Sequence, residues 1–499
     1  MVYSIAPSSL NGDLLWAGSN SGLIHITRDG GKTWKDVTPK GVTDWSNIAF
    51  LEASHFDPAE AYAAVDRHRL DDQQPYLYRT RDYGASWQLI TNGMAAPSFL
   101  RAVRQDPQDK NLLFAGTEFG IYVSFDDGDH WQSLQMNLPV TSVHDLVVHG
   151  DDLVIATHGR SFWVLDDITA LRQVSKAGQA AEAWFYAPAT AVRVENDSFL
   201  GTPVPPEEPA AQNPPKGAIV DYYLKSAATQ IKLEIFDLKG HLIRGFSSGD
   251  AREVKHLPFA IADRWFPKPQ VLDRTPGMHR FVWDLAWGRT SAKTEDGDDD
   301  EEYGAPRGPL VVPGTYELKL TVDGKTSTQK LNVVMDPRLA VTAAELDQQY
   351  SLGQKMFAEA TRSRQALAEI RAVQAQIAAV QGKLGDQQAE LKASVRSVQE
   401  EIKKLLSGSA RSGEGMGLEI ASGGIGGALR MVESGHRAVP SQAIAVFEES
   451  DRAAKLRIEE WTRMKTTRLR QLNDQLKRAN ADTVSIGEIE HEIEYLMTR

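Results

Sequence analysis

A short sequence box that recurs three times constrains the fold of this chain more than any other feature. Residues 27–34 read TRDGGKTW, residues 80–87 read TRDYGASW and residues 124–131 read SFDDGDHW. The shared pattern is Ser/Thr-x-Asp-x-Gly-x-x-Trp, and successive boxes begin 53 and 44 residues apart. A period of about 40–50 residues is the length of one four-stranded blade of a β-propeller.

The segments around the boxes repeat as well. An apolar, strand-like stretch precedes each box and reads LWAG, AYAAV and LFAG in turn. Residues 154–165 read as a fourth copy, whose box has lost its Gly and Trp and keeps only Asp166 and Asp167. The sequence therefore predicts about four propeller blades within residues 1–170.

We expect the box residues to be structural. The Asp and Ser/Thr side chains can satisfy backbone N–H groups of a tight turn, and the Gly can adopt a positive φ at low cost. Each Trp can bury its ring between neighbouring sheets. The structural residues predicted in this way are Asp29, Gly31, Trp34, Asp82, Gly84, Trp87, Asp126, Gly128 and Trp131.

These repeats resemble the Asp-box, or bacterial neuraminidase, repeat. The chain looks most like the sortilin-type propellers and the large bacterial exported proteins that are often labelled glycosyl hydrolases on these repeats. Propellers of this family have more blades than about four, so the resemblance implies an incomplete ring and the C-terminal portion of a longer protein. It also implies a periplasmic or secreted location, although the first residues do not read as a signal peptide.

Three further regions follow the predicted blades. Residues 171–216 contain a cluster of prolines and read as an extended connector. Residues 217–336 contain short alternating strands and turns, typical of an immunoglobulin-like or fibronectin-like β-sandwich. Residues 340–499 predict a helical hairpin, antiparallel bundle or coiled coil. The acidic segment 295–302 is interpreted as a solvated insertion whose role stays open.

Heptad spacing supports the helical prediction. A capping box at Thr342 marks the first helix, and a Gly/Ser-rich loop is expected at residues 407–427 before a last helix at about 440–479. Apolar residues at 3-4 spacing make one stripe that must be buried against another helix. The predicted core includes Val380, Leu391, Val398, Ile402 and Trp461.

Catalytic motifs are hard to find in this sequence. The chain has no Cys, and its His residues lack the spacing of metal ligands, so we predict no catalytic residues, no metal and no cofactor. Arg101, Glu118, His158 and Arg160 are the binding candidates. The last two belong to a Thr-His-Gly-Arg segment that resembles one in the bacterial relatives.

Charge and hydropathy limit the kinds of molecule that this chain can be expected to bind. Residues 1–170 hold 12 basic and 22 acidic side chains, which disfavours nucleic acid as a partner. No apolar run is long enough to span a membrane. The sequence favours an extracytoplasmic scaffold that binds protein, peptide or glycan and self-associates through an incomplete propeller or the helices. The alternative is a glycoside hydrolase or lyase with part of its active site in further blades.

The box interpretation can be tested at Asp82. Replacing Asp82 by Ala should lower the free energy of unfolding by roughly 1–3 kcal/mol, because turn N–H groups lose their acceptor. Chemical denaturation measures this change. A variant that unfolds like the wild type but loses ligand binding would show that Asp82 contacts a ligand instead.

Overall fold

The chain divides into two compact units. The first contains Met1–Ala189 with Asp221–Lys225, and the second contains Thr190–Val220 with Ser226–Arg499. The acidic segment 295–302 and half of the predicted connector at residues 171–216 lie outside the described residues. The described half of the connector forms short helical turns at Leu171–Gln173 and Val174–Ala177 and short strands at Ala183–Phe185 and Ala191–Arg193, so the expectation of an extended connector was wrong there. The computed structural model describes residues 1–177, 182–194, 214–250, 270–288, 308–385, 388–410 and 413–485.

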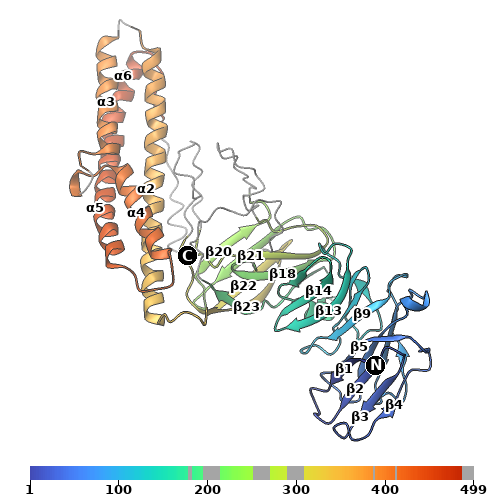
Figure 1. Ribbon diagram of the computed structural model, residues 1–499. Coiled ribbons are helices and arrows are strands. Elements are labelled where there is room, and N and C mark those ends of the chain that lie inside the picture. Colours follow the sequence, from blue (N-terminus) through green and yellow to red (C-terminus); the bar gives the residue numbers. More distant parts are fainter. Residues whose placement is uncertain are drawn as a thin grey trace. The chain divides into compact units, whose positions relative to one another are not determined.

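Small antiparallel sheets follow one another along the first unit (Figure 1). Within residues 1–177, the first three sheets have four strands in chain order and the last has three. Their strands are β1 (Val2–Pro7), β2 (Leu15–Ser19), β3 (Ile24–Thr27) and β4 (Lys35–Asp36); β5 (Asn47–Ala53), β6 (Ala61–Asp66), β7 (Tyr76–Thr80) and β8 (Gln88–Leu89); β9 (Leu100–Gln105), β10 (Leu113–Thr117), β11 (Gly120–Ser124) and β12 (Gln132–Ser133); and β13 (Ser142–His149), β14 (Asp152–His158) and β15 (Phe162–Leu165).

The order of these sheets is that of propeller blades. The first strand of each sheet lies beside the first strand of the next, so that β5 contacts β1 and β9, and β13 contacts β9. In a propeller the first strands of the blades face a common axis. We therefore number the sheets as blades 1 to 4. Short elements follow them: η1 (His68–Leu70) inserts in blade 2, and η2 (Leu171–Gln173), α1 (Val174–Ala177) and β16 (Ala183–Phe185) come after blade 4.

Each Asp box closes a turn through the same set of hydrogen bonds. In the second box the Thr80 hydroxyl donates to Asp82 at 2.9 Å and accepts from the Gly84 N–H at 2.9 Å. The Asp82 carboxylate also accepts from the N–H and the hydroxyl of Ser86, at 2.8 and 2.6 Å. The first and third boxes repeat this pattern. Hydrogen bonds from Thr33 lower the pKa of Asp29 to about 2, so this turn holds an ionised carboxylate.

The box tryptophans dock on the preceding blade. The Trp87 indole donates to the Val37 carbonyl of blade 1 at 2.7 Å, and the Trp131 indole donates to the Ile90 carbonyl of blade 2 at 2.9 Å. Trp34 does not follow this rule, because its side of blade 1 has no blade against it in the described part of the chain. Trp34 is 45% exposed, so the prediction that its ring is buried between sheets was wrong.

The second unit contains a five-stranded sheet among its described residues. Its strand order is β17-β23-β22-β19-β20, with β17 parallel to β23. Among the short strands and turns expected within residues 217–336, β22 and β23 form a hairpin and pair across a turn at Asp323 and Gly324. An immunoglobulin sandwich is not shown. The remaining strands of the described residues are β17 (Ala191–Arg193), β18 (Ala218–Leu224), β19 (Ile231–Phe236), β20 (Leu242–Ser247), β21 (Gly277–Trp283), β22 (Gly314–Val322) and β23 (Lys325–Met335).

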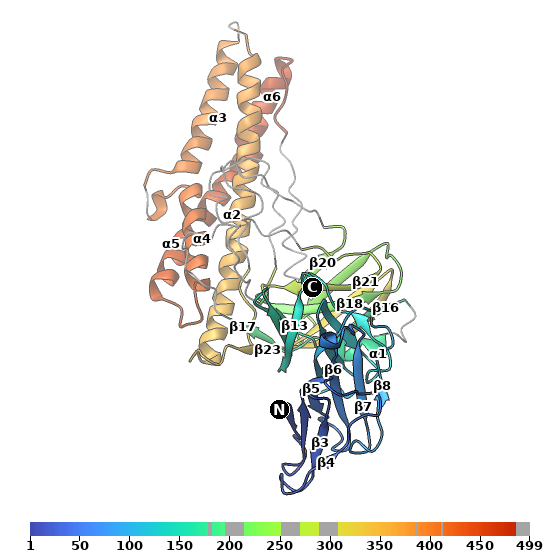
Figure 2. The same ribbon diagram turned by 45° about the vertical axis from the view of Figure 1, so that its right-hand side comes forward.

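Long helices complete the second unit, and α2 and α3 run side by side in both views (Figures 1 and 2). The capping box at Thr342 is confirmed, and the predicted core residues Val380, Leu391, Val398, Ile402 and Trp461 all lie in one buried cluster. The helices are α2 (Ala343–Lys383), α3 (Ala389–Ser407), α4 (Leu418–Glu433), α5 (Ser441–Met464) and α6 (Arg470–Arg478), with a 3₁₀ turn at Gly413–Gly415 and a π-helical turn at Lys465–Leu469.

Helix α4 corrects the expectation of a Gly/Ser-rich loop at residues 407–427. Its apolar residues Leu418, Ala421, Ile425 and Leu429 recur at helical spacing and are buried in the same cluster. Glycine disfavours an isolated helix, but burial of this stripe stabilises one in the folded chain.

Ile402 tests the packing of the helices. It is fully buried, so Ile402→Asp places a carboxylate in an apolar seam and should lower the thermal midpoint strongly. Circular dichroism of the full chain measures this change. Lys403→Asp places the same carboxylate at the neighbouring exposed position, although it also removes a positive charge, and should leave the midpoint nearly unchanged. Equal midpoints for the two variants would contradict the buried seam.

Candidate binding site

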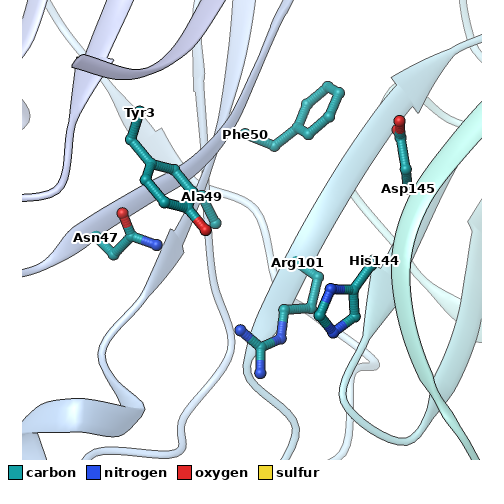
Figure 3. Close-up of a pocket in the computed structure, with 7 residues that line it drawn as sticks. All are labelled: Tyr3, Asn47, Ala49, Phe50, Arg101, His144 and Asp145. Carbon is teal, nitrogen blue, oxygen red and sulfur yellow. The ribbon is translucent and has the colours of Figure 1, made fainter. Parts of the chain in front are cut away.

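A cavity of about 230 Å³ lies among the first strands of the blades (Figure 3). In Figure 3, Tyr3 and Asn47 lie on one side of it, and Arg101 and His144 lie together on the other. The lining residues come from β1, β5, β9 and β13, so every blade contributes. They are Tyr3, Asn47, Ala49, Phe50, Arg101, His144 and Asp145.

A β-bulge at the same place in each first strand shapes this cavity. The pairing of first and second strands skips one residue in every blade, namely Tyr3, Ala49, Arg101 and His144. All four skipped residues line the cavity. A β-bulge changes the direction of a side chain, which then departs from the regular alternation between the two faces of the sheet. Bulges are common next to functional sites. The repeat therefore presents one residue per blade to the cavity.

Arg101 is held between two carboxylates. Its guanidinium donates to Asp66 at 3.1 Å and to Glu118 at 2.9 Å, and Glu118 also accepts from the Ser142 hydroxyl at 2.8 Å. Partial burial raises the pKa of Glu118, but the hydrogen bonds from Ser142 and Arg101 outweigh it and the net pKa lies below its usual value. Glu118 is thus an ionised carboxylate that positions Arg101.

A second arginine pairs with Asp145, the carboxylate that lines the cavity. Arg104 donates to Asp145 at 3.2 Å and to Glu52 at 2.8 Å, and its guanidinium lies 4.3 Å from the centre of the Phe50 ring. Glu118 and Asp145 are therefore both paired with arginine.

Two histidines stack at the edge of the cavity. The rings of His144 and His158 lie 5.3 Å apart and nearly parallel. Burial, then the positive charge of Arg101 and then His158 lower the pKa of His144, and Glu118 opposes them. His144 is therefore an uncharged imidazole at neutral pH, and it can both donate and accept a hydrogen bond.

The structure brings three of the four binding candidates together. Arg101 and Glu118 form an ion pair, and His158 stacks on the cavity residue His144. Arg160 has an exposed side chain on the next loop, and its carbonyl accepts from the Trp163 indole at 2.9 Å.

Sequence reasoning missed the bulged positions other than Arg101. A signal was present, since Ala49, Arg101 and His144 follow the Asp of the preceding box by 20, 19 and 18 residues. Aligning the blades on their boxes would have placed these residues within two positions of one another.

The loops beside the cavity form a continuous rim. Successive strands of a blade run in opposite directions. The loop that follows the second strand and the loop that follows the fourth strand therefore lie at the same end of the blade. Backbone hydrogen bonds join these loops, as between Ser98 and Gln73 at 2.9 Å and between Glu118 and Phe99 at 3.1 Å. The loop rim is defined as residues 20–23, 37–46, 67–75, 90–99, 118–119, 134–141 and 159–161.

The loop rim exposes several large apolar side chains and is electrically balanced. Trp45, Met136 and Val140 are 71%, 71% and 72% exposed, and Leu70 and Phe119 are also exposed. The rim carries four acidic and four basic side chains, while the rest of residues 1–170 carries 18 acidic and eight basic ones. A rim without net charge, with exposed apolar side chains, therefore lies on an otherwise acidic unit.

The described residues offer no cluster of three or more His, Asp or Glu side chains that could hold a metal ion. None of the helices in this part of the chain combines the length and apolar character needed to cross a bilayer.

Comparison with known proteins gives distant structural similarities. No protein-family model and no curated protein matches this sequence. The chain is similar to the GH74 enzyme of Niastella koreensis, with 17% identity and a TM-score of 0.27 over 31% of this chain and 26% of that one. It is similar to Ycf48 bound to a D1 peptide, with 20% identity and a TM-score of 0.27 over 33% and 51% of the two chains. The GH74 xyloglucanase of Xanthomonas campestris matches at 9% identity and a TM-score of 0.28, over 66% of this chain and 47% of that one.

These neighbours are Asp-box propeller proteins, but similarity this low carries no argument about function. The chain spans about a quarter to a half of the length of these three structures. The blade interpretation rests on the sheets and boxes described above.

The environment of His144 yields a prediction for NMR titration. We expect His144 to titrate below the usual histidine pKa of 6.5. Arg101→Met removes a neighbouring positive charge and should raise the pKa of His144. Arg160→Met removes a charge from an exposed loop side chain and serves as the control, with a smaller shift expected. An unchanged pKa of His144 in Arg101→Met would contradict the described contact.

Proposed function

We propose that the first unit binds a segment of protein or peptide along the loop rim, with the cavity of bulged residues receiving part of it. The observation that carries this proposal is the exposed apolar surface of Trp45, Met136 and Val140 beside a cavity to which every blade contributes. Exposed apolar surface of this kind marks interaction sites in soluble proteins.

The charge distribution indicates the chemistry of the bound segment. The loop rim is balanced in charge, and the arginines of the cavity are already paired with Asp66, Glu118, Glu52 and Asp145. A strongly charged ligand would find no complementary field here. The surface fits an uncharged polypeptide segment whose apolar side chains pack on Trp45, Met136 and Val140.

The enzyme alternative is less well supported. Glycoside hydrolysis needs a carboxylic acid that stays protonated long enough to donate its proton. The pKa of Glu118 is lowered instead, and Arg104 holds Asp145. Glu118 and Asp145 therefore serve to position the arginines that they contact. We also propose a periplasmic or secreted setting, which rests on the family resemblance, and an immunoglobulin-like fold for residues 217–336, which rests on their alternating strands.

Selection of peptides from a displayed random library against the full chain tests this function. We expect selected peptides to be rich in apolar residues and to bind with little dependence on salt, because the rim is neutral. The double variant Trp45→Ser, Val140→Ser should weaken binding by about 10-fold or more, since buried aromatic anchors dominate such interfaces.

A matched control distinguishes the rim from general apolar exposure. Leu10 is 48% exposed in the loop after β1, at the other end of the blade, so Leu10→Ser should leave the affinity unchanged. Fluorescence anisotropy with a labelled selected peptide measures both variants. Equal loss of affinity in both, or selection of charged peptides alone, would contradict the proposal.

A further inference from the structure

Two of the exposed apolar side chains of the loop rim belong to residues whose backbone conformation disfavours them. Trp45 has a φ of 67° and Met136 has a φ of 42°. A positive φ is uncommon for residues other than Gly, and it is strained for a bulky side chain. Strained residues persist only where the surrounding structure holds them, and they cluster at active sites and ligand-binding sites.

The turn at Trp45 normally takes a different residue. The Ser46 N–H donates to the Thr43 carbonyl at 3.1 Å, so Trp45 is the third residue of a four-residue turn. A positive φ at the third residue alone makes this a type II turn, which requires Gly or Asn at that position. The Trp45 N–H also donates to the Ser21 carbonyl at 3.1 Å. These backbone hydrogen bonds fix the turn and do not involve the indole ring.

The turn at Met136 shows the same departure. The Leu138 N–H donates to the Gln135 carbonyl at 2.8 Å, so Met136 is the second residue of its turn, where a positive φ favours Gly, Asn or Asp. The side-chain amide of Gln135 braces this turn by donating to the carbonyls of Leu138 and Pro139 at 2.7 and 3.0 Å. The corresponding loop of blade 2 holds Gly93 at positive φ. Met136 therefore occupies a turn in which a smaller residue would be favourable.

Packing within the described residues does not offset this strain. The side chains of Trp45 and Met136 are both largely exposed, so neither gains much from apolar burial in the chain itself. The other rim residues with a positive φ are glycines or small polar residues, namely Gly22, Asp71, Gly93, Gly159 and Ser161. What sets Trp45 and Met136 apart is therefore a large apolar side chain that a fixed turn presents to solvent.

We infer that Trp45 and Met136 determine which segment the loop rim binds, each by packing against an apolar side chain of that segment. The inference rests on the proposed peptide binding. A fixed turn holds the side chain in place before binding, so that less conformational entropy is lost in the complex. The indole ring is large and rigid, whereas a Met side chain is flexible and adapts to different partners. Trp45 therefore selects one kind of apolar residue, and Met136 accepts several.

Glycine variants of the full chain test this inference. Trp45→Gly and Met136→Gly each introduce a residue that the turn favours, so the thermal midpoint should stay the same or rise. Each variant should nevertheless weaken the binding of a library-selected peptide by about 10-fold or more, measured by fluorescence anisotropy. Asp71→Gly is the matched control, because Asp71 is an exposed rim residue with a φ of 56° and a polar side chain. Its affinity for the same peptide should stay close to that of the wild type.

Double-mutant cycles between the chain and the peptide assign the contacts. Each apolar residue of the selected peptide is replaced by Ala, and its affinity is measured with the wild type and with both glycine variants. The peptide residue that packs on Trp45 should lose its effect in Trp45→Gly and keep it in Met136→Gly, and a second peptide residue should show the reverse. Across the selected peptides, the first position should hold one kind of apolar residue, and the second should vary among apolar residues.

Three results with a selected peptide would overturn this inference alone. Wild-type affinity in both glycine variants would show that other residues bind the peptide. An equal loss of affinity in Asp71→Gly would show that the conformation of the rim, and not the two side chains, decides binding. Additive effects in every double-mutant cycle would show that neither side chain contacts the peptide. If the library yields no peptide at all, the proposed function fails, and this inference fails with it.

Discussion

The docking of the second and third Asp boxes on the preceding blade is the contact on which the first unit depends. The box turn holds a glycine at positive φ against an aliphatic side chain of the blade before it, and a Cβ at Gly84 or Gly128 would lie 2.6 Å from Val37 or 2.5 Å from Ile90. The box indole of the same blade then donates to the carbonyl of that Val or Ile. The turn of the box therefore fixes how closely a blade approaches the preceding blade and how the two sheets are oriented.

Stacking of the blades in turn creates the candidate site. The first strands lie side by side, and each carries a bulge at the same place. Four side chains of different chemical type therefore line one cavity. The repeat supplies the geometry, and the residue at each bulge supplies the chemistry. Arg101 and His144 differ in charge and hydrogen bonding from Tyr3 and Ala49, so the same fold can present a different surface in each blade.

The helical part of the second unit shows how far a periodic pattern can be trusted. Ile402 and Trp461 were predicted as core residues from spacing and are buried. The stripe of α4 was overlooked because its glycines and serines read as a loop when taken locally. Tertiary burial of Leu418, Ala421 and Ile425 outweighs the low helix propensity of the intervening residues.

The sequence by itself determined the blade repeat, the turn role of Asp29, Asp82 and Asp126, and the heptad seam, because each depends on residues close together in the chain. Only the tertiary structure decided that Trp87 and Trp131 have a blade to dock on while Trp34 does not. It also decided that Arg101 meets Glu118 and that His144 meets His158, since these residues come together through strand pairing and blade stacking. Local sequence fixes which turn forms, but burial and charge pairing depend on which surfaces the folded chain brings into contact.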